Sequence, residues 1–231
     1  MGADEMKIIK VEAQCRLLNE MQHFYHQVLG LELLDKTEHS FCVQIGSTAL
    51  YFERTDETLP SSYHFAINIP ENQIADSLEF VRKQVNPIQE DGQTIIHFED
   101  WNAHSFYFLD PDGNILECIA RHNLSNASNE KFSISSYINI SEVGVPVRDV
   151  RAAVETMKTE LGINYWLEQS DTFTPVGDEE GLIILVKEGR QWFMSDVIAA
   201  PLPTKIHIDD AQGSVITYSS QNEIKIITKH T

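Results

Sequence analysis

The sequence lacks the features that mark an exported or a membrane protein. Nowhere in its 231 residues is there an apolar run of about 18 residues, the length that a membrane-spanning helix needs. The acidic start, residues 1–6, has no apolar core of the kind found in a signal peptide. The sequence therefore predicts a cytoplasmic protein with no membrane partner.

Basic residues are also scarce. The chain has 17 Lys and Arg against 35 Asp and Glu, which gives a formal net charge of −18. A chain of this charge repels a phosphate backbone, so nucleic acid is not an expected partner. An anionic membrane surface is disfavoured for the same reason.

Cysteine is rare as well. The three cysteines are Cys15, Cys42 and Cys118, an odd number without any Cys-x-x-Cys spacing. This pattern favours reduced thiols in a reducing compartment rather than a disulfide framework.

What the sequence does have is an internal repeat. Three segments carry apolar residues at the period of an amphipathic helix, and each follows a strand-like run, at residues 8–15, 64–69 and 140–147. The helical positions are Leu17, Met21, Phe24, Val28, then Ile74, Leu78, Val81, Val85, and then Val150, Val154, Met157, Leu161. Further strand-like runs follow the first helix at 32–35, 41–45 and 49–53, and the second at 94–98, 105–109 and 114–120.

A βαβββ unit thus occurs twice within residues 1–122. The polar, aperiodic stretch 123–135 predicts a linker. Residues 136–231 then hold a third unit and a truncated fourth without a helix, with strands expected at 165–167, 181–186, 192–194, 205–208, 215–218 and 223–227. One unit cannot bury both faces of its sheet, so we expect units one and two to pair, and the third to pair with the C-terminal strands. The predicted fold class is α+β, with curved mixed sheets and helices on their outer face.

His64 opens the first strand of the second unit. By strand alternation it shares one face with Ala66 and Asn68, while the apolar residues between and beyond them share the other. The apolar set is expected to face the helix, which turns His64 toward the concave side of the sheet. A half-buried histidine bonded to a neighbour is the structural alternative.

Glu117 lies in the otherwise apolar run 114–120. A lone carboxylate there must be exposed, paired or bound to a metal, because isolated burial costs several kcal/mol. Arg121 or a backbone donor would be the structural partner and a metal ion the functional one. Both alternatives remain open.

Three motifs resemble the vicinal-oxygen-chelate superfamily, which includes glyoxalase I, bleomycin-resistance proteins and ring-cleaving dioxygenases. They are residues 24–31, residues 63–67, and the hairpin Ser-Phe-Tyr-Phe-Leu-Asp-Pro-Asp-Gly-Asn-Ile-Leu-Glu at 105–117. The resemblance implies that His64 and Glu117 bind a divalent transition metal (Fe, Mn, Ni or Zn), with Glu117 also catalytic. It also implies a substrate whose two adjacent oxygens chelate the metal, and a homodimer, since superfamily members often dimerise.

The chain departs from this pattern on its first strand. The position where the superfamily has another histidine is Lys10, so Glu12, two residues on and on the same face, is the expected third ligand. The corresponding position of the third unit falls near Glu142, which is also not histidine. Beside the site, Trp101, His104 and Phe106 are expected to bind substrate, although His104 also suits a solvated loop.

Two functions are consistent with these residues. One is a metal-dependent lyase, isomerase or dioxygenase acting on a small molecule with adjacent oxygens. The other, suggested by the missing first-strand histidine, is a protein that binds or sequesters a small apolar ligand without turnover.

Overall fold

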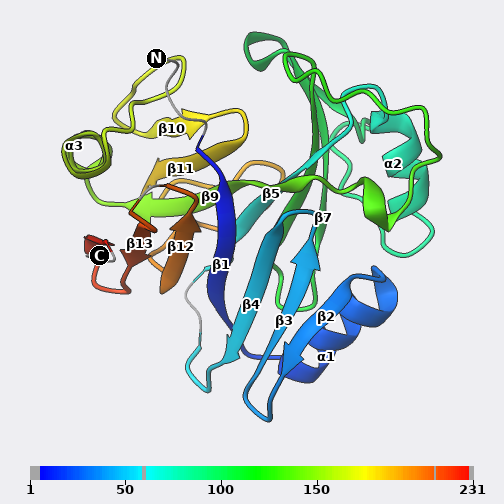
Figure 1. Ribbon diagram of the computed structural model, residues 1–231, viewed down its shortest axis with the longest axis horizontal. Coiled ribbons are helices and arrows are strands. Elements are labelled where there is room, and N and C mark those ends of the chain that lie inside the picture. Colours follow the sequence, from blue (N-terminus) through cyan, green and yellow to red (C-terminus); the bar gives the residue numbers. More distant parts are fainter. Residues whose placement is uncertain (1–5, 59–60, 211, 229–231) are drawn as a thin grey trace.

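The computed structural model describes residues 6–58, 61–210 and 212–228, and within them the chain forms two seven-stranded sheets (Figure 1). In spatial order the first sheet contains β14 (Ile224–Ile227), β13 (Val215–Tyr218), β12 (Thr204–Ile208), β1 (Ile8–Cys15), β4 (Thr48–Arg54), β3 (Ser40–Ile45) and β2 (Glu32–Lys36). The second contains β10 (Phe173–Asp178), β11 (Gly181–Lys187), β9 (Asn139–Val147), β5 (His64–Ile69), β8 (Ile115–Arg121), β7 (Ala103–Leu109) and β6 (Ile96–Phe98).

The three predicted helices are present. They are α1 (Leu18–Gln22), which continues as the π-helical turn η1 (His23–Val28), α2 (Ile74–Val81) and α3 (Val150–Leu161). Figure 1 shows α1 and α2 at one side of the molecule and α3 at the opposite side. Short 3₁₀ turns occur at η2 (Glu99–Trp101) and η3 (Ile134–Ser136). No helix of the described residues is long and apolar enough to cross a membrane.

The two sheets join the units differently from the expected pairing. In each of the first two units the opening strand, β1 or β5, stands at the edge of its own four strands and needs a partner. Strand β12 pairs with β1, and β9 pairs with β5, both antiparallel. Unit one therefore shares a sheet with the C-terminal strands, and unit two shares the other with the third unit. Each sheet therefore contains strands from both sides, along the sequence, of the expected linker at residues 123–135.

Local predictions after α3 were less accurate than those before it. The run 165–167 takes part only in the isolated bridge Tyr165–Val176, and the run 192–194 forms no strand and follows the isolated bridge Gln191–Ile198. Strand β10, which sequence reasoning missed, carries Pro175 and Gly177, and both residues lower strand propensity. It nevertheless forms because it is an edge strand, where a missing backbone donor is tolerated.

The main hydrophobic core connects the sheets and the helices. Phe52 of β4 and Phe65 of β5 meet across the two sheets, with ring centroids 6.5 Å apart. Phe65, Ile67 and Ile69 all belong to this core, as do the α2 residues that the helical stripe identified. The alternation inferred for β5 therefore holds, and it leaves His64 on the opposite face.

The start of α1 depends on a turn that is distant in sequence. Leu17, which precedes α1, makes no side-chain cap. Instead, the carboxylate of Asp112, between β7 and β8, accepts hydrogen bonds from the backbone N–H of Arg16 at 2.6 Å and of Leu17 at 3.2 Å. A negative charge at a helix N-terminus also interacts favourably with the helix dipole.

We therefore expect Asp112→Ala to lower the free energy of unfolding by about 1 kcal/mol. Chemical denaturation measures this change. Asp100→Ala, which removes an exposed carboxylate from η2, is the control and should change stability by less than about 0.5 kcal/mol. Equal effects of the two substitutions would contradict the capping role.

Candidate functional site

Three adjacent strands bring one histidine and two glutamates together. His64 lies on β5, Glu117 on β8 and Glu142 on β9, and β5 runs between the other two strands. Both glutamates are in register with Ala66, one from each side. Because residues 64 and 66 of a strand share a face, the register places both carboxylates on the face of His64. The small side chain of Ala66 leaves room between them.

The three side chains converge within ligand distance of one another. Nε2 of His64 lies 3.5 Å from Oε2 of Glu117 and 3.8 Å from Oε2 of Glu142. One ligand atom from each residue lies within 4.8 Å of the other two, and this is the one such group of three among the described residues. All three residues are buried.

Burial and mutual charge set the protonation of the group. Burial raises the pKa of Glu117, and the neighbouring Glu142 carboxylate raises it further, to about 7. Burial alone would raise the pKa of Glu142, but Arg121 and His64 hold it below its ordinary value. Burial lowers the pKa of His64, but the neighbouring carboxylates of Glu142 and Glu117 outweigh this effect, so the pKa is raised overall.

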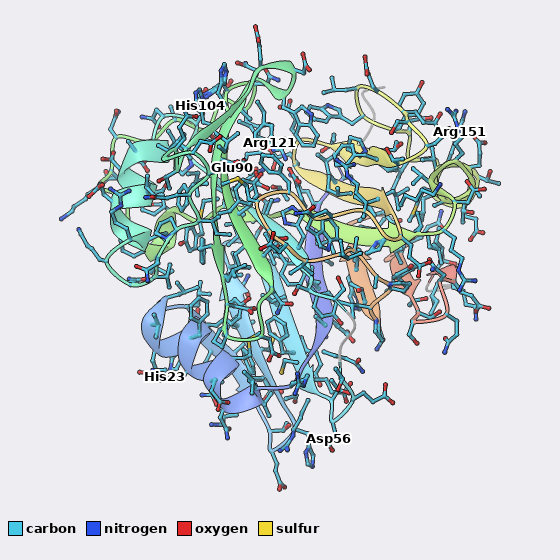
Figure 2. The ribbon with its side chains drawn as sticks, turned by 180° about the vertical axis from the view of Figure 1, so that it is seen from behind. His23, Asp56, Glu90, His104, Arg121 and Arg151 are labelled. Atoms are coloured by element: carbon cyan, nitrogen blue, oxygen red, sulfur yellow. The ribbon has the colours of Figure 1, made fainter. Side chains whose placement is uncertain are left out.

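Arg121 is the fourth ionisable group of the cluster. It ends β8, is fully buried, and forms an ion pair through Nη2 with Oε1 of Glu142. Its Nε donates a hydrogen bond to Oδ1 of Asn68 at 3.1 Å. Figure 2 shows Arg121 and His104 at the same end of the green strands β7 and β8.

His64, Glu117 and Glu142 line a cavity of about 260 Å³ whose walls are mainly apolar. The aromatic lining residues are Phe98, Trp101, Tyr107, Phe173, Trp192 and Phe193. Arg190 lines the cavity too, and is exposed to solvent. A cavity with apolar walls and a few convergent polar groups suits a small organic ligand.

Two of the three expected substrate-binding residues lie outside this cavity. Trp101 lines it, but Phe106 is fully buried in the main core. On β7 it is Tyr107, in register with Glu117, that faces the site, so Phe106 must face the other way. His104 instead contacts two other histidines: its ring stacks on His97, and its Nδ1 lies 2.8 Å from Nε2 of His122.

The structure also places Glu12 apart from His64 and Glu117, in the other sheet. Its carboxylate contacts Nζ of Lys10 at 2.8 Å, Nζ of Lys205 at 2.9 Å and Nε2 of His207 at 2.9 Å. Burial raises its pKa, but these contacts outweigh burial and lower the pKa to about 2. Glu12 is therefore an ion-paired residue of the sheet that contains β1 and β12. Glu142, and not Glu12, is the third side chain beside His64 and Glu117.

Sequence reasoning also missed the cavity-lining role of Tyr107. A signal for Glu142 was present, since it is a charged residue in the apolar run 139–147, as Glu117 is in its own strand. It was set aside because it is not histidine. No local signal indicated that β9 lies beside β5.

The family comparison concerns the first two units. A model of the Glyoxalase/Bleomycin resistance protein/Dioxygenase superfamily matches residues 7–118. No curated protein matches the sequence.

Solved structures share the fold over a longer part of the chain. A "putative dioxygenase" from Bacillus subtilis subsp. subtilis str. 168 is 17% identical with a TM-score of 0.59, and the match covers 80% of this chain and 64% of that one. Glyoxalase I from Zea mays is 13% identical with a TM-score of 0.55, over 94% of each chain. At these identities the likeness is one of fold.

The cavity depends on the absence of a side chain at Gly144 of β9. A Cβ there would lie 2.5 Å from Cη2 of Trp192 and 3.0 Å from Cβ of His64. We therefore expect Gly144→Ala to displace the Trp192 indole, shift tryptophan emission to longer wavelength and lower the melting temperature. Adding Trp192→Phe removes the clashing atom, so in that background Gly144→Ala should no longer lower the melting temperature. If the alanine costs as much stability in the Trp192→Phe background, the close contact is not the cause.

The raised pKa of Glu117 predicts a pH dependence for the metal-free protein. Between its unfolded pKa near 4.5 and its folded value of about 7, the folded state binds more protons, so stability falls as pH rises. Glu117→Gln removes this titration, and its melting temperature should fall less between pH 5 and pH 7.5. Thermal unfolding with a chelator present measures both proteins. Parallel profiles would show that Glu117 does not titrate in this range.

Proposed function

Residues 7–118 of this chain belong to the Glyoxalase/Bleomycin resistance protein/Dioxygenase superfamily, and from that premise we propose a metal-dependent enzyme acting on a small molecule with two adjacent oxygen atoms. The observation that carries the proposal is the convergence of His64, Glu117 and Glu142 at an aromatic cavity. Their order along the chain is irrelevant to binding, because the register of β8, β5 and β9 brings them together.

The residues fit a divalent transition ion. One imidazole and two carboxylates are ligands that Fe(II), Mn(II), Ni(II) and Zn(II) accept, and three protein ligands leave positions open for a substrate. Oε2 of Glu142 faces His64 while its Oε1 contacts Arg121, so one oxygen can bind a metal and the other keeps its partner. Such outer partners orient ligands in known metal sites.

The metal would supply Lewis-acid stabilisation of negative charge on the two substrate oxygens. The protein's own residues would do the rest. Glu117 would accept a proton from the substrate at a carboxylate oxygen and return it to the product. The Tyr107 ring and the Trp192 indole border the same space and would supply apolar contacts to the substrate.

A second function has its own supporting observation. Without a metal, both buried glutamates already have partners, since His64 contacts Glu117 and Glu142 and Arg121 contacts Glu142. A cluster whose members satisfy one another suits a protein that binds an aromatic ligand without catalysis. The two functions differ in whether the cluster takes up a metal ion.

Metal analysis tests the proposal. We expect about one Mn, Fe, Ni or Zn ion per chain in the wild-type protein after loading and desalting, and loss of most of it in His64→Ala and Glu142→Ala. Glu12→Ala is the matched control, because it removes a glutamate that is ion-paired in the other sheet. Binding should weaken below about pH 6, where His64 and Glu117 are protonated.

The same proteins separate the two functions. If His64→Ala and Glu142→Ala retain the metal of the wild type, or if no variant binds any, the enzyme proposal fails at this site. Stabilisation of the metal-free wild type by aromatic ligands in a thermal-shift screen would then favour the binding protein.

A further inference from the structure

Arg121 has more contacts than a structural ion pair requires. It is fully buried, it pairs with Glu142 and Asn68, and its guanidinium carbon lies 5.5 Å from the ring centre of Trp101 and 5.7 Å from that of Trp166. Its Nη1 has no hydrogen-bond partner among the described residues. A buried donor without a partner is costly, so the Nη1 group by itself lowers the free energy of unfolding.

The charge of Arg121 changes the electrostatics of the loaded site. Charged side chains on the cavity wall are His64, Glu117, Glu142 and Arg190, and Arg190 is screened because it is exposed. With a divalent ion bound and His64 neutral, the two carboxylates cancel the charge of the ion. Arg121 then leaves one positive charge in a buried, largely apolar environment.

A site with two histidines and one carboxylate would carry the same single positive charge. In this chain the second imidazole is replaced by Glu142, and the negative charge that this adds is offset by Arg121, its direct ion-pair partner. Glu142 and Arg121 together are thus electrically equivalent to one neutral ligand.

We propose that Arg121 is a positioning and charge-setting residue, which orients Glu142 and makes the loaded site select an anionic chelating ligand. This inference rests on the proposed function, since it assumes a metal at His64, Glu117 and Glu142. The ligand class is a molecule that presents two adjacent oxygens with at least one negative charge, such as a catecholate or an enediolate. A neutral ligand would leave the buried positive charge unbalanced.

The experiment uses Zn(II)-loaded protein and 4-nitrocatechol, a chelating anion whose absorbance reports its deprotonation on binding. Zinc content is measured for each variant, so that metal binding and anion binding are separate readouts. Arg121→Met removes the charge and retains much of the side-chain length. Arg121→Lys keeps the positive charge but loses the planar guanidinium group and its several N–H donors.

Arg121→Met should still load zinc, because all three ligands remain, although loss of the partner that orients Glu142 lowers the affinity for the metal. Its affinity for 4-nitrocatechol should fall by at least about tenfold, since a full positive charge is lost from the side chain that contacts Glu142, a residue that lines the cavity. Arg121→Lys should lose less. The double variant Arg121→Met with Glu142→His restores one positive charge without any arginine, and it should bind the probe within about threefold of wild type.

The double variant also keeps the charge argument testable if Arg121→Met alone fails to fold. Arg121→Met alone leaves Glu142 unpaired and buried without metal, whereas the double variant leaves no such charge. If the double variant binds zinc but loses the probe, the charge argument is overturned, because only an arginine-specific structural role remains. If Arg121→Met binds the probe as wild type does, the inference is likewise overturned while the metal site stands. If His64→Ala binds zinc as well as the wild type does, the proposed function and this inference fail together.

Discussion

The pairing of β5 with β8 on one side and β9 on the other is the constraint on which the site depends. It aligns Glu117 and Glu142 with the same residue, Ala66, so that two carboxylates flank the histidine two positions earlier. A shift of either register by one residue would turn that carboxylate to the opposite face. The backbone hydrogen bonds of three strands therefore hold the ligand geometry, and the chain needs no loop to assemble it.

Placing four ionisable side chains in an apolar interior requires that they balance one another. Arg121 and His64 offset the two glutamates: His64 contacts one glutamate on each neighbouring strand, and Arg121 of β8 reaches across β5 to Glu142 of β9. A divalent ion would displace the proton of His64 and leave Arg121 as the surplus charge. The same buried arginine thus stabilises the metal-free protein and determines the charge of the loaded one, which links folding stability to ligand preference.

Much of the site was predictable from local pattern. His64 was found as the polar residue opening an apolar strand, and Glu117 as a lone carboxylate in another, and the structure brings the two together. Face assignment failed on β7, where Phe106 was chosen although Tyr107 faces the site, because both neighbours are aromatic and alternation alone does not say which face is which. The third ligand was sought at Glu12 because the superfamily places a ligand on the first strand, where this chain has Lys10.

The sequence by itself determined the repeated βαβββ units, the three amphipathic helices and the two residues that the second unit contributes to the site. All of these follow from the periods of helix and strand, which are local properties of the chain. Which unit lies beside which was decided only by tertiary structure, because any exposed strand edge can accept any other strand and periodicity does not encode the choice. That choice put Glu142 in the site, left Glu12 among lysines in the other sheet, and brought Arg121 into contact with the glutamate whose charge it balances.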